Sequence, residues 1–360
     1  MSRRTALLSA GLAAGAVAGG VVGRAVYRRR HADHGSIGPP PPDVLGPVTA
    51  ADGTQLAGRS AGAAGAPVVL LAHGFSLDLS IWASVWPELA ETFRVVAFDH
   101  RSHGASGRAT DGDLSIRTIG RDLAAVLDAA APQAPVVVVG HSMGAMAILA
   151  LAEQRPELFG ERIVGVVLIG GASRDLLAGA MGAVTGLLKP RLASMGEAAR
   201  RVDRIRRAVL AGPADVAGTV ARLTQFGPDV PAHVVDHVVG LAERARREVW
   251  TDGLADLMRM DLRHAVPRVR VPALVVVGEH DRVTPPAAAL ELAGALPDGH
   301  LVVLEGAGHI PMLERPDALV AELVAFAGPV LRGEPLPARP VPLDPGSRSR
   351  PAADPGEGAA

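Results

Sequence analysis

Short apolar runs recur through the middle of the chain and are separated by longer amphipathic stretches. Polar residues rarely interrupt these runs, which is typical of strands that a parallel sheet buries on both faces. Two further short segments, 48–50 and 55–58, flank Asp52-Gly53, a dipeptide that favours a hairpin turn. The runs that predict buried strands span residues 68–72, 94–98, 136–139, 164–169, 273–277 and 301–304.

The stretches between the runs show helical periodicity. Ser115 can act as the N-cap of a helix in which Ile119 and Leu123 share one face. Residues 143–154 are apolar on nearly all sides, which indicates a buried helix. Strands and helices that alternate along a chain predict an α/β fold, with a mostly parallel central sheet and helices on both faces.

This alternation stops between about residues 174 and 267, and we expect that stretch to be a helical cap inserted over the sheet. Its arginine clusters indicate solvated helix faces, with binding of a substrate carboxylate as the alternative. They comprise Arg204, Arg206 and Arg207, and Arg244, Arg246 and Arg247. Its apolar residues favour a lipophilic acyl or alcohol portion in the substrate, although core packing explains them equally well. These are Leu176, Leu177, Met181, Leu187, Leu188 and Met195.

Both ends of the chain differ in composition from the body, residues 48–327. Residues 6–23 carry no charge and lie between arginines, so we expect residues 1–34 to be a hydrophobic anchor or signal segment. An uncleaved membrane anchor is favoured, with its sidedness open, and export through a twin-arginine-like signal is the alternative. Residues 35–47 are predicted to be a proline-rich linker and residues 328–360 a disordered proline-rich tail.

Composition and charge narrow the classes of function. The 360-residue chain has a formal net charge of −1 and lacks the basic footprint that usually accompanies nucleic-acid binding. It contains no cysteine, which excludes disulfides, thiol catalysis and cysteine-bound metal. The cap histidines His233, His237 and His264 are too widely spaced to indicate a metal site, and no cofactor is expected. The sequence leaves the oligomeric state open.

A serine between two glycines directly follows the apolar run 136–139. At the exit of a buried strand this pattern predicts a nucleophile elbow, where the chain turns sharply into a helix and presents the serine. The two glycines leave out side chains that would collide at that crossing. Because the chain has 42 glycines, the pentapeptide alone is a weak signal, and other motifs must decide. The pentapeptide is Gly140-His141-Ser142-Met143-Gly144.

Three other motifs accompany the pentapeptide in a fixed order, each next to a predicted strand. Together the four motifs resemble the α/β-hydrolase fold superfamily, in particular serine esterases and lipase-like hydrolases with a helical cap, over nearly all of residues 48–327. Related epoxide hydrolases and haloalkane dehalogenases carry aspartate at the elbow, so Ser142 argues against both activities. The three motifs are His73-Gly74-Phe75, Gly278-Glu279-His280-Asp281 and Gly308-His309.

The expected chemistry starts from Ser142. A serine hydroxyl is a poor nucleophile at neutral pH and needs an adjacent base to accept its proton. His309 fits that role, and Asp281 is the carboxylate expected to orient the imidazole and to stabilise its cation. The order Ser142, Asp281, His309 is the order of this fold. The rival candidates are His280 and His300 for the base, and Asp256 and Asp261 for the carboxylate.

The tetrahedral intermediate of acyl transfer needs hydrogen-bond donors directed at its oxyanion. We expect the backbone N–H of Met143, the residue after the nucleophile, to be one donor, and the resemblance implies the N–H of Phe75 as the second. His73 and His141 are expected to be structural. Residues 99–106 resemble a scaffold loop of the family, in which Ser102 stands where glycine is common.

These expectations converge on a cofactor-independent serine hydrolase that cleaves carboxylic esters through an acyl-enzyme intermediate. Its expected partner is a small, lipophilic acyl substrate, and membrane association rests on the N-terminal segment alone. An acyltransferase or perhydrolase with the same three residues is the alternative, because the sequence does not distinguish the acyl acceptor. A catalytically silent binding protein of this fold would be expected to lack part of the set, and this chain retains all three residues.

Overall fold

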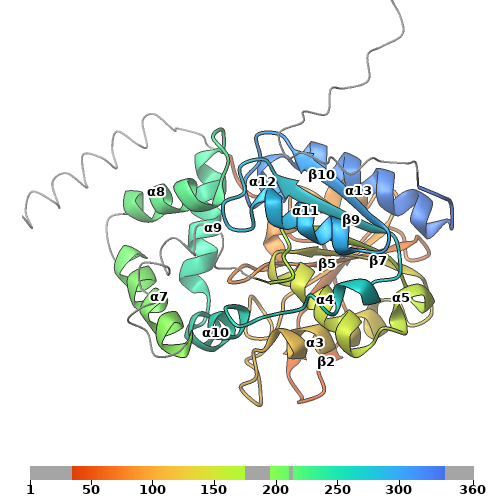
Figure 1. Ribbon diagram of the computed structural model, residues 1–360, viewed down its shortest axis with the longest axis horizontal. Helices are drawn as coiled ribbons and strands as arrows, with labels where there is room; N and C mark the ends of the chain where they lie inside the picture. Colours follow the sequence, from red (N-terminus) through yellow and green to blue (C-terminus); the bar gives the residue numbers. More distant parts are fainter. Residues whose placement is uncertain (1–34, 175–194, 211–213, 337–360) are drawn as a thin grey trace, which may run out of the picture.

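The computed structural model describes residues 35–174, 195–210 and 214–336. Its centre is an eight-stranded sheet in the order β1-β4-β6-β5-β7-β8-β9-β10 (Figure 1). The β1–β4 and β4–β6 pairs are antiparallel, and the other pairs are parallel. A separate hairpin joins β2 (Val48–Thr49) to β3 (Gln55–Leu56). The strands of the large sheet are β1 (Asp43–Val44), β4 (Gly58–Ala61), β5 (Val68–Ala72), β6 (Arg94–Phe98), β7 (Val136–His141), β8 (Ile163–Ile169), β9 (Ala273–Gly278) and β10 (Gly299–Leu304).

The central strands are buried on both faces because their side chains alternate between two apolar cores. Val68 and Leu70 of β5 belong to one core, and Val69 and Leu71 belong to the other. The four valines that open β7 divide in the same way. Such strands require uninterrupted apolar runs, so the predicted strands agree with the structure. Those over 68–72 and 94–98 coincide with β5 and β6, and the others differ by one or two residues at an end.

Helices cover both faces of the sheet, as predicted (Figure 1). The side chain of Ser115 accepts a hydrogen bond from the N–H of Thr118 at the start of α3, and α4 has the predicted bounds. Helices α3 (Ile116–Ala130), α4 (Met143–Gln154) and α11 (Pro286–Ala295) pack on one core, and α2 (Trp86–Leu89), α12 (Pro311–Glu314) and α13 (Pro316–Leu331) on the other. Shorter segments are η1 (Leu79–Trp82), α5 (Leu158–Glu161) and η5 (Val266–Arg268).

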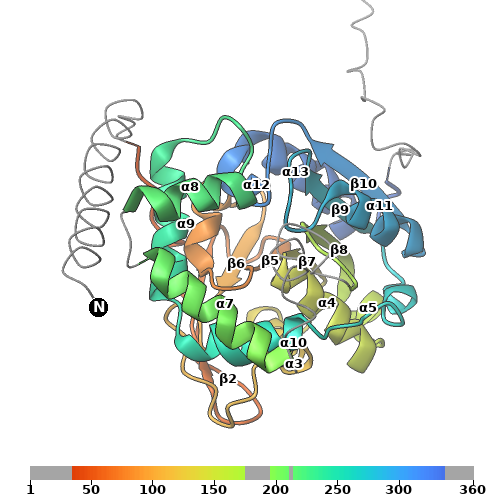
Figure 2. The same cartoon turned by 60° about the vertical axis from the view of Figure 1, so that its left-hand side comes forward.

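The segment between β8 and β9 forms the helical cap, which lies in front of the sheet in Figure 2. Val235 and Val238 of α9 are buried in the same apolar core as Ile310 and Met312, so the cap and the loop that follows β10 share one core. The predicted apolar cap residues between 176 and 188 lie outside the described residues. The cap helices are α7 (Met195–Leu210), α8 (Ala214–Gln225), α9 (Ala232–Arg244), the π-helical η4 (Val249–Gly253) and α10 (Leu254–Leu257).

The structure differs from both predicted boundaries of the body. The predicted linker, residues 35–47, contains β1 and the buried Leu45, and the indole N–H of Trp86 donates to the carbonyl of Pro39 over 2.9 Å. β1 is too short, and its partner β4 too polar, to give an apolar run. At the other end α13 continues to Leu331, because Val330 is buried against the sheet despite the proline beside it.

The predicted anchor or signal, residues 1–34, and most of the predicted tail lie outside the described residues. Among the residues that the structure does describe, no helix combines the length and the apolar character needed to cross a bilayer.

Candidate active site

Ser142 lies at the sharp turn between β7 and α4, as the motif predicts. Its φ of +51° is one that residues other than glycine rarely adopt. The sheet helps to fix this conformation, because the Ser142 N–H donates to the Ile169 carbonyl over 2.8 Å. The flanking glycines are sterically required. A Cβ on Gly144 would lie 2.3 Å from the carbonyl oxygen of Ala72, and one on Gly140 would lie 2.5 Å from the backbone of the following helix.

The structure brings Ser142, His309 and Asp281 together from three different loops. The Ser142 hydroxyl lies 3.1 Å from Nε2 of His309, and Nδ1 of the same ring lies 2.8 Å from Oδ2 of Asp281. An ionised carboxylate only accepts, so Nδ1 carries the proton and Nε2 is free to accept from the serine. The exposed fractions of the three residues are 8%, 5% and 3%, which limits competition from water.

The rival candidates lie in other interactions. His280 and His300 pair with the neighbouring carboxylates of Glu279 and Asp298. Asp261 forms an ion pair with Arg263, and Asp256 accepts from the backbone N–H of Ile116. None of these side chains is hydrogen-bonded to Ser142 or His309 within the described part of the chain.

Asp281 is held as an ionised acceptor. Its Oδ1 accepts the backbone N–H groups of Val283 and Thr284, both over 2.8 Å, and the Thr284 hydroxyl lies 2.9 Å from Oδ2. Burial alone would raise the pKa of this carboxyl group. The charge that His309 can carry, together with the hydrogen bonds from His309 and Thr284, outweighs burial and lowers the pKa below its usual value.

His141, expected to be structural, supports the loop that carries His309. Its Nε2 lies 2.8 Å from the His309 carbonyl oxygen, so the ring donates there. Burial and the neighbouring charge of His309 lower the pKa of His141 to about 3, which keeps the ring neutral near pH 7. His73 is also fully buried and lies 2.8 Å, through Nδ1, from the carbonyl oxygen of Gly74. Both histidines therefore fit the expected structural role.

The two backbone groups expected to face an oxyanion lie on either side of the serine. Met143 is the first residue of α4, and Phe75 follows Gly74 in the loop after β5. A Cβ on Gly74 would lie 3.2 Å from the Cβ of Ser142, so this loop passes directly beside the serine. Within the described residues, neither the Met143 N–H nor the Phe75 N–H donates to a protein acceptor. Both donors are thus available to a ligand.

The scaffold loop 99–106 keeps a left-handed residue at the position of Ser102. Its φ is +60°, and its hydroxyl oxygen accepts the N–H of Ala109 over 3.0 Å. Ser102 therefore adopts a backbone conformation that glycine takes up most readily. Within the same loop, burial and neighbouring charges lower the pKa of His103 to about 3.

Three residues that support the site were missed from the sequence: Thr284, Gln225 and Glu314. Thr284 bonds Asp281, and the Gln225 carbonyl accepts the backbone N–H of His309 over 2.6 Å. Glu314 is a buried carboxylate, 6% exposed, at the end of α12. A glutamate within the apolar stretch that follows His309 was the available signal, because an unpaired buried charge is costly and needs a partner.

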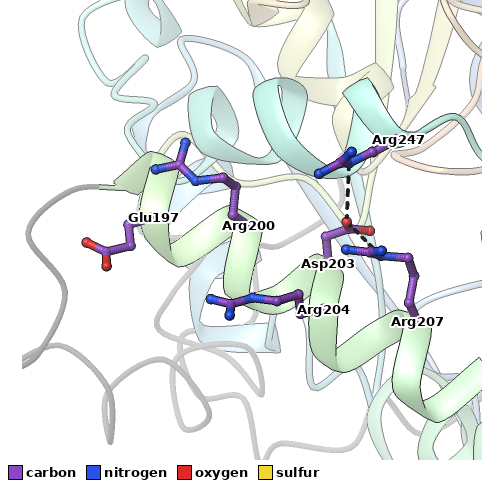
Figure 3. A pocket seen from close by; sticks show the side chains of 6 residues that line it. All are labelled: Glu197, Arg200, Asp203, Arg204, Arg207 and Arg247. Atoms are coloured by element: carbon purple, nitrogen blue, oxygen red, sulfur yellow. Dashed lines mark hydrogen bonds and ion pairs between the residues drawn. The ribbon is translucent and has the colours of Figure 1, made fainter.

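The cap also has a hollow, which is lined by none of the candidate catalytic or supporting residues. It has a volume of about 250 Å³ and lies between α7 and Arg247, just before η4 (Figure 3). The buried carboxylate of Asp203 pairs with Arg206 at 2.8 Å and Arg207 at 3.1 Å, so these arginines form an ion-pair network as well as a helix face. Glu197, Arg200, Asp203, Arg204, Arg207 and Arg247 line the hollow. In the described ranges no cluster of three or more histidine or acidic side chains could hold a metal ion.

A mostly parallel sheet with helices on both faces, a serine at a strand-to-helix turn and a helical cap define an enzyme of the α/β-hydrolase fold. The sequence profile of the alpha/beta hydrolase family matches residues 68–323, and the chain belongs to this family. It is therefore a hydrolase of the α/β type.

Similar proteins carry names of ester-cleaving enzymes. The pimeloyl-[acyl-carrier protein] methyl ester esterase of Neisseria meningitidis is 27% identical over 260 residues, covering 70% of this chain and 90% of that protein. The crystal structure of the enol-lactonase from Burkholderia xenovorans matches with a TM-score of 0.61 and 28% identity, over 77% of this chain and 97% of that one. A thermophilic esterase from Thermogutta terrifontis matches with a TM-score of 0.64 and 26% identity, over 80% and 99% of the two chains.

Proposed function

We propose that this enzyme hydrolyses carboxylic esters in two steps, with Ser142 as the nucleophile and a serine-bound acyl group as the intermediate. The observation that carries the proposal is the hydrogen-bonded chain from Ser142 through His309 to Asp281, with separations of 3.1 and 2.8 Å. A base within hydrogen-bond reach of a hydroxyl, itself oriented by a carboxylate, is the arrangement that nucleophilic acyl transfer needs.

In the first step the Ser142 oxygen attacks the ester carbonyl while its proton passes to Nε2 of His309. The ionised Asp281 stabilises the resulting imidazolium. When the tetrahedral intermediate collapses, His309 returns this proton to the departing alkoxide, which leaves as the alcohol. A water molecule then attacks the acyl group with His309 again as the base, and the acid leaves as Ser142 recovers its proton.

The N–H groups of Met143 and Phe75 are proposed to stabilise the oxyanion in both steps. Two features support this role: neither donates to a protein acceptor in the described residues, and the Gly74 loop passes beside Ser142. Donors fixed by the backbone need no reorganisation when charge develops, and removal of one such donor typically costs about 10²–10³-fold in turnover.

The substrate class proposed here is a small carboxylic ester, with lactones included because a lactone is a cyclic ester. The names of the similar proteins, a methyl ester esterase, an enol-lactonase and an esterase, share an ester bond as the point of attack. A panel of p-nitrophenyl esters of increasing acyl length, together with five- and six-membered lactones, would test this class and the predicted lipophilic acyl portion.

The direct test is hydrolysis of p-nitrophenyl acetate by the wild type and by Ser142→Ala. We expect turnover by the wild type and its loss, by at least about 10⁴-fold, in the variant. Ser80→Ala is a matched control, because the Ser80 hydroxyl also lies 2.8 Å from a histidine nitrogen, that of His237, outside this site. A wild type that turns over no ester, or a Ser142→Ala variant with full activity, would refute the proposal.

We also propose that residues 1–34 attach the enzyme to a membrane, on the basis of the uncharged stretch 6–23 between arginines. Fractionation of the tagged full-length chain, beside a variant without residues 1–34, tests this. The full chain should remain with membranes through carbonate washing and the shortened one should not. Equal recovery of both in the soluble fraction would rule the attachment out.

A further inference from the structure

The buried carboxylate of Glu314 has no part in the proton transfers described above, yet it lies between the loop of His309 and the cap. Its Oε2 accepts the N–H of Gly308 over 2.9 Å, and its Oε1 accepts the N–H of Ile310 over 3.0 Å. These are the residues immediately before and after His309. One side chain therefore fixes the backbone on both sides of the proposed base.

The same carboxylate also holds the cap. Oε2 accepts a second backbone N–H, that of Gly227, over 2.7 Å, from the turn that follows α8. A second bond joins the same two segments directly: the His309 N–H donates to the carbonyl of Gln225 over 2.6 Å. The turn at residues 225–227 and the His309 loop are thus joined by a direct backbone bond and by Glu314 as a bridge.

The two loops are packed so closely that only glycine fits between them. A Cβ on Gly227 would lie 2.2 Å from the carbonyl oxygen of Gly306, and one on Gly308 would lie 2.5 Å from the carbonyl oxygen of Gln225. A small displacement of the cap turn would therefore press on the His309 loop. Backbones packed this closely transmit a displacement from one loop to the other, because well-packed atoms leave no space to take it up.

The hydrogen bonds to the Glu314 carboxylate come from these three backbone amides. In the described residues no arginine, lysine or histidine forms an ion pair with its carboxylate, and both oxygens face N–H donors. Burial raises the pKa of Glu314, while the three N–H groups act in the opposite direction. A buried carboxylate without a counter-ion is costly, and an apolar side chain would fill the same space at lower cost.

We propose that Glu314 is a positioning residue that joins the cap turn, residues 225–227, to the His309 loop, so that the orientation of His309 depends on the seating of the cap. This inference rests on the proposed function, because it assigns His309 the role of base. It makes the cap turn part of the support of that base, in addition to any part the cap plays in binding substrate.

The first test is Glu314→Gln, measured by steady-state hydrolysis of p-nitrophenyl acetate. The amide oxygen can keep two of the N–H bonds, but its NH₂ group then faces a third donor. We expect kcat to fall about 10- to 100-fold with KM within a few fold, because a misplaced base affects the chemical step. Glu279→Gln is the matched control: Glu279 accepts the N–H of Gly306 in the same loop but is exposed, and the variant should retain wild-type kcat.

The pH profile supplies a readout that a purely structural role would not change. The titratable groups facing His309 are Asp281 from the β9 loop, His141 from β7 and Glu314 from α12. Glu314→Gln removes a negative charge that favours the protonated imidazole of His309. The acid limb of the kcat/KM profile should therefore move to lower pH, and Glu279→Gln should leave it in place.

The second test acts from the cap side. Gly227→Ala pushes the cap turn against the His309 loop without altering charge, so kcat should fall while the acid limb stays in place. If Glu314→Gln does not fold, kcat of Gly227→Ala alone tests whether the cap turn supports His309. Wild-type kcat in both variants would overturn the positioning role. Loss of kcat in Glu314→Gln with wild-type kcat in Gly227→Ala would also overturn it, because the cap would then not be coupled to the base. A wild type without esterase activity would instead refute the proposed function.

Discussion

The two sides of the candidate site are built by different means. On one side, Ser142 is fixed by the junction of β7 and α4, where backbone geometry and glycines hold it in a left-handed conformation. On the other side, His309 lies in a loop that polar groups from the adjoining helix and from distant segments hold in place. These groups are the side chains of His141, Asp281 and Glu314 and the carbonyl of Gln225.

The two sides should therefore respond differently to mutation. The serine side depends on close steric fit in the apolar centre of the fold, so an added atom there should destabilise the protein. The histidine side depends on hydrogen bonds and charge, so removal of a polar atom there should reduce activity more than stability. The predictions below test this division.

Among the tests of this division, the largest effect is expected on the histidine side, from Asp281→Asn. The amide can present a donor to Nδ1 of His309, which favours the wrong tautomer and removes the charge that stabilises the imidazolium. We expect kcat for p-nitrophenyl acetate to fall by about 10³–10⁴-fold. The melting temperature should change little, because the side chain keeps its size and an oxygen acceptor.

Asp261→Asn is the matched control, since Asp261 was the rival carboxylate and pairs with Arg263 at the surface. Its kcat should equal that of the wild type. If Asp281→Asn instead loses stability in proportion to activity, the division between the two sides is incorrect.

A second effect concerns the neutral histidines beneath both sides, His141 under the base and His103 beside the Phe75 loop. The pKa of each is lowered to about 3 in the folded chain, against an ordinary value of 6.5. The unfolded chain therefore binds more protons below pH 6.5, so stability is full above that pH and falls as the pH drops towards 3. Between pH 6.5 and 5 these two rings together should cost about 3 kcal/mol of unfolding free energy.

Urea denaturation at pH 7, 6 and 5 measures this loss. His141→Asn should flatten the dependence, because one of the buried rings no longer titrates; His73 and His100, whose pKa values burial also lowers, still contribute to it. An unfolding free energy that stays constant from pH 7 to pH 5 would contradict the assignment of these rings as buried and neutral.

The smallest effect is expected on the serine side, from Gly144→Ala. The added Cβ would meet the Ala72 carbonyl oxygen at 2.3 Å, and a backbone oxygen in the sheet cannot easily move away. Overpacking of this kind should cost about 2–3 kcal/mol of unfolding free energy, measured in urea. Gly294→Ala is the control, because a Cβ there meets nothing within 4 Å, and the helix α11 should gain slightly from alanine. Equal stability of the two variants would argue against the steric account.

The same division explains what the sequence could predict. β5, β6, β7 and α4 follow from apolar runs and from the glycine pattern, because their burial is encoded in consecutive residues. The proximity of Ser142, Asp281 and His309 follows from the resemblance and from motif order. Each partner of that set lies at the end of a strand of one sheet, so the fold brings them together.

The supports of His309 could not be predicted in the same way. Glu314 bonds Gly227 and Gln225 bonds His309 across long stretches of sequence. A glutamate in an apolar stretch signals a buried charge, but nothing in the sequence identifies its distant partner. β1 and β4 were missed for a related reason. They are the two outermost strands at one end of the sheet, two and four residues long. Such short strands need no apolar run, and their pairing depends on a neighbour already in place.

The central claim is that Ser142 carries the acyl group during turnover. Rapid mixing of the wild type with excess p-nitrophenyl butyrate, acid quenching and mass spectrometry of the digested protein test this most directly. We predict a mass increase of one butyryl group on the peptide that contains Ser142, in the wild type and not in Ser142→Ala. Turnover with no acyl group on Ser142, at mixing times shorter than one catalytic cycle, or acylation of another residue would contradict the account.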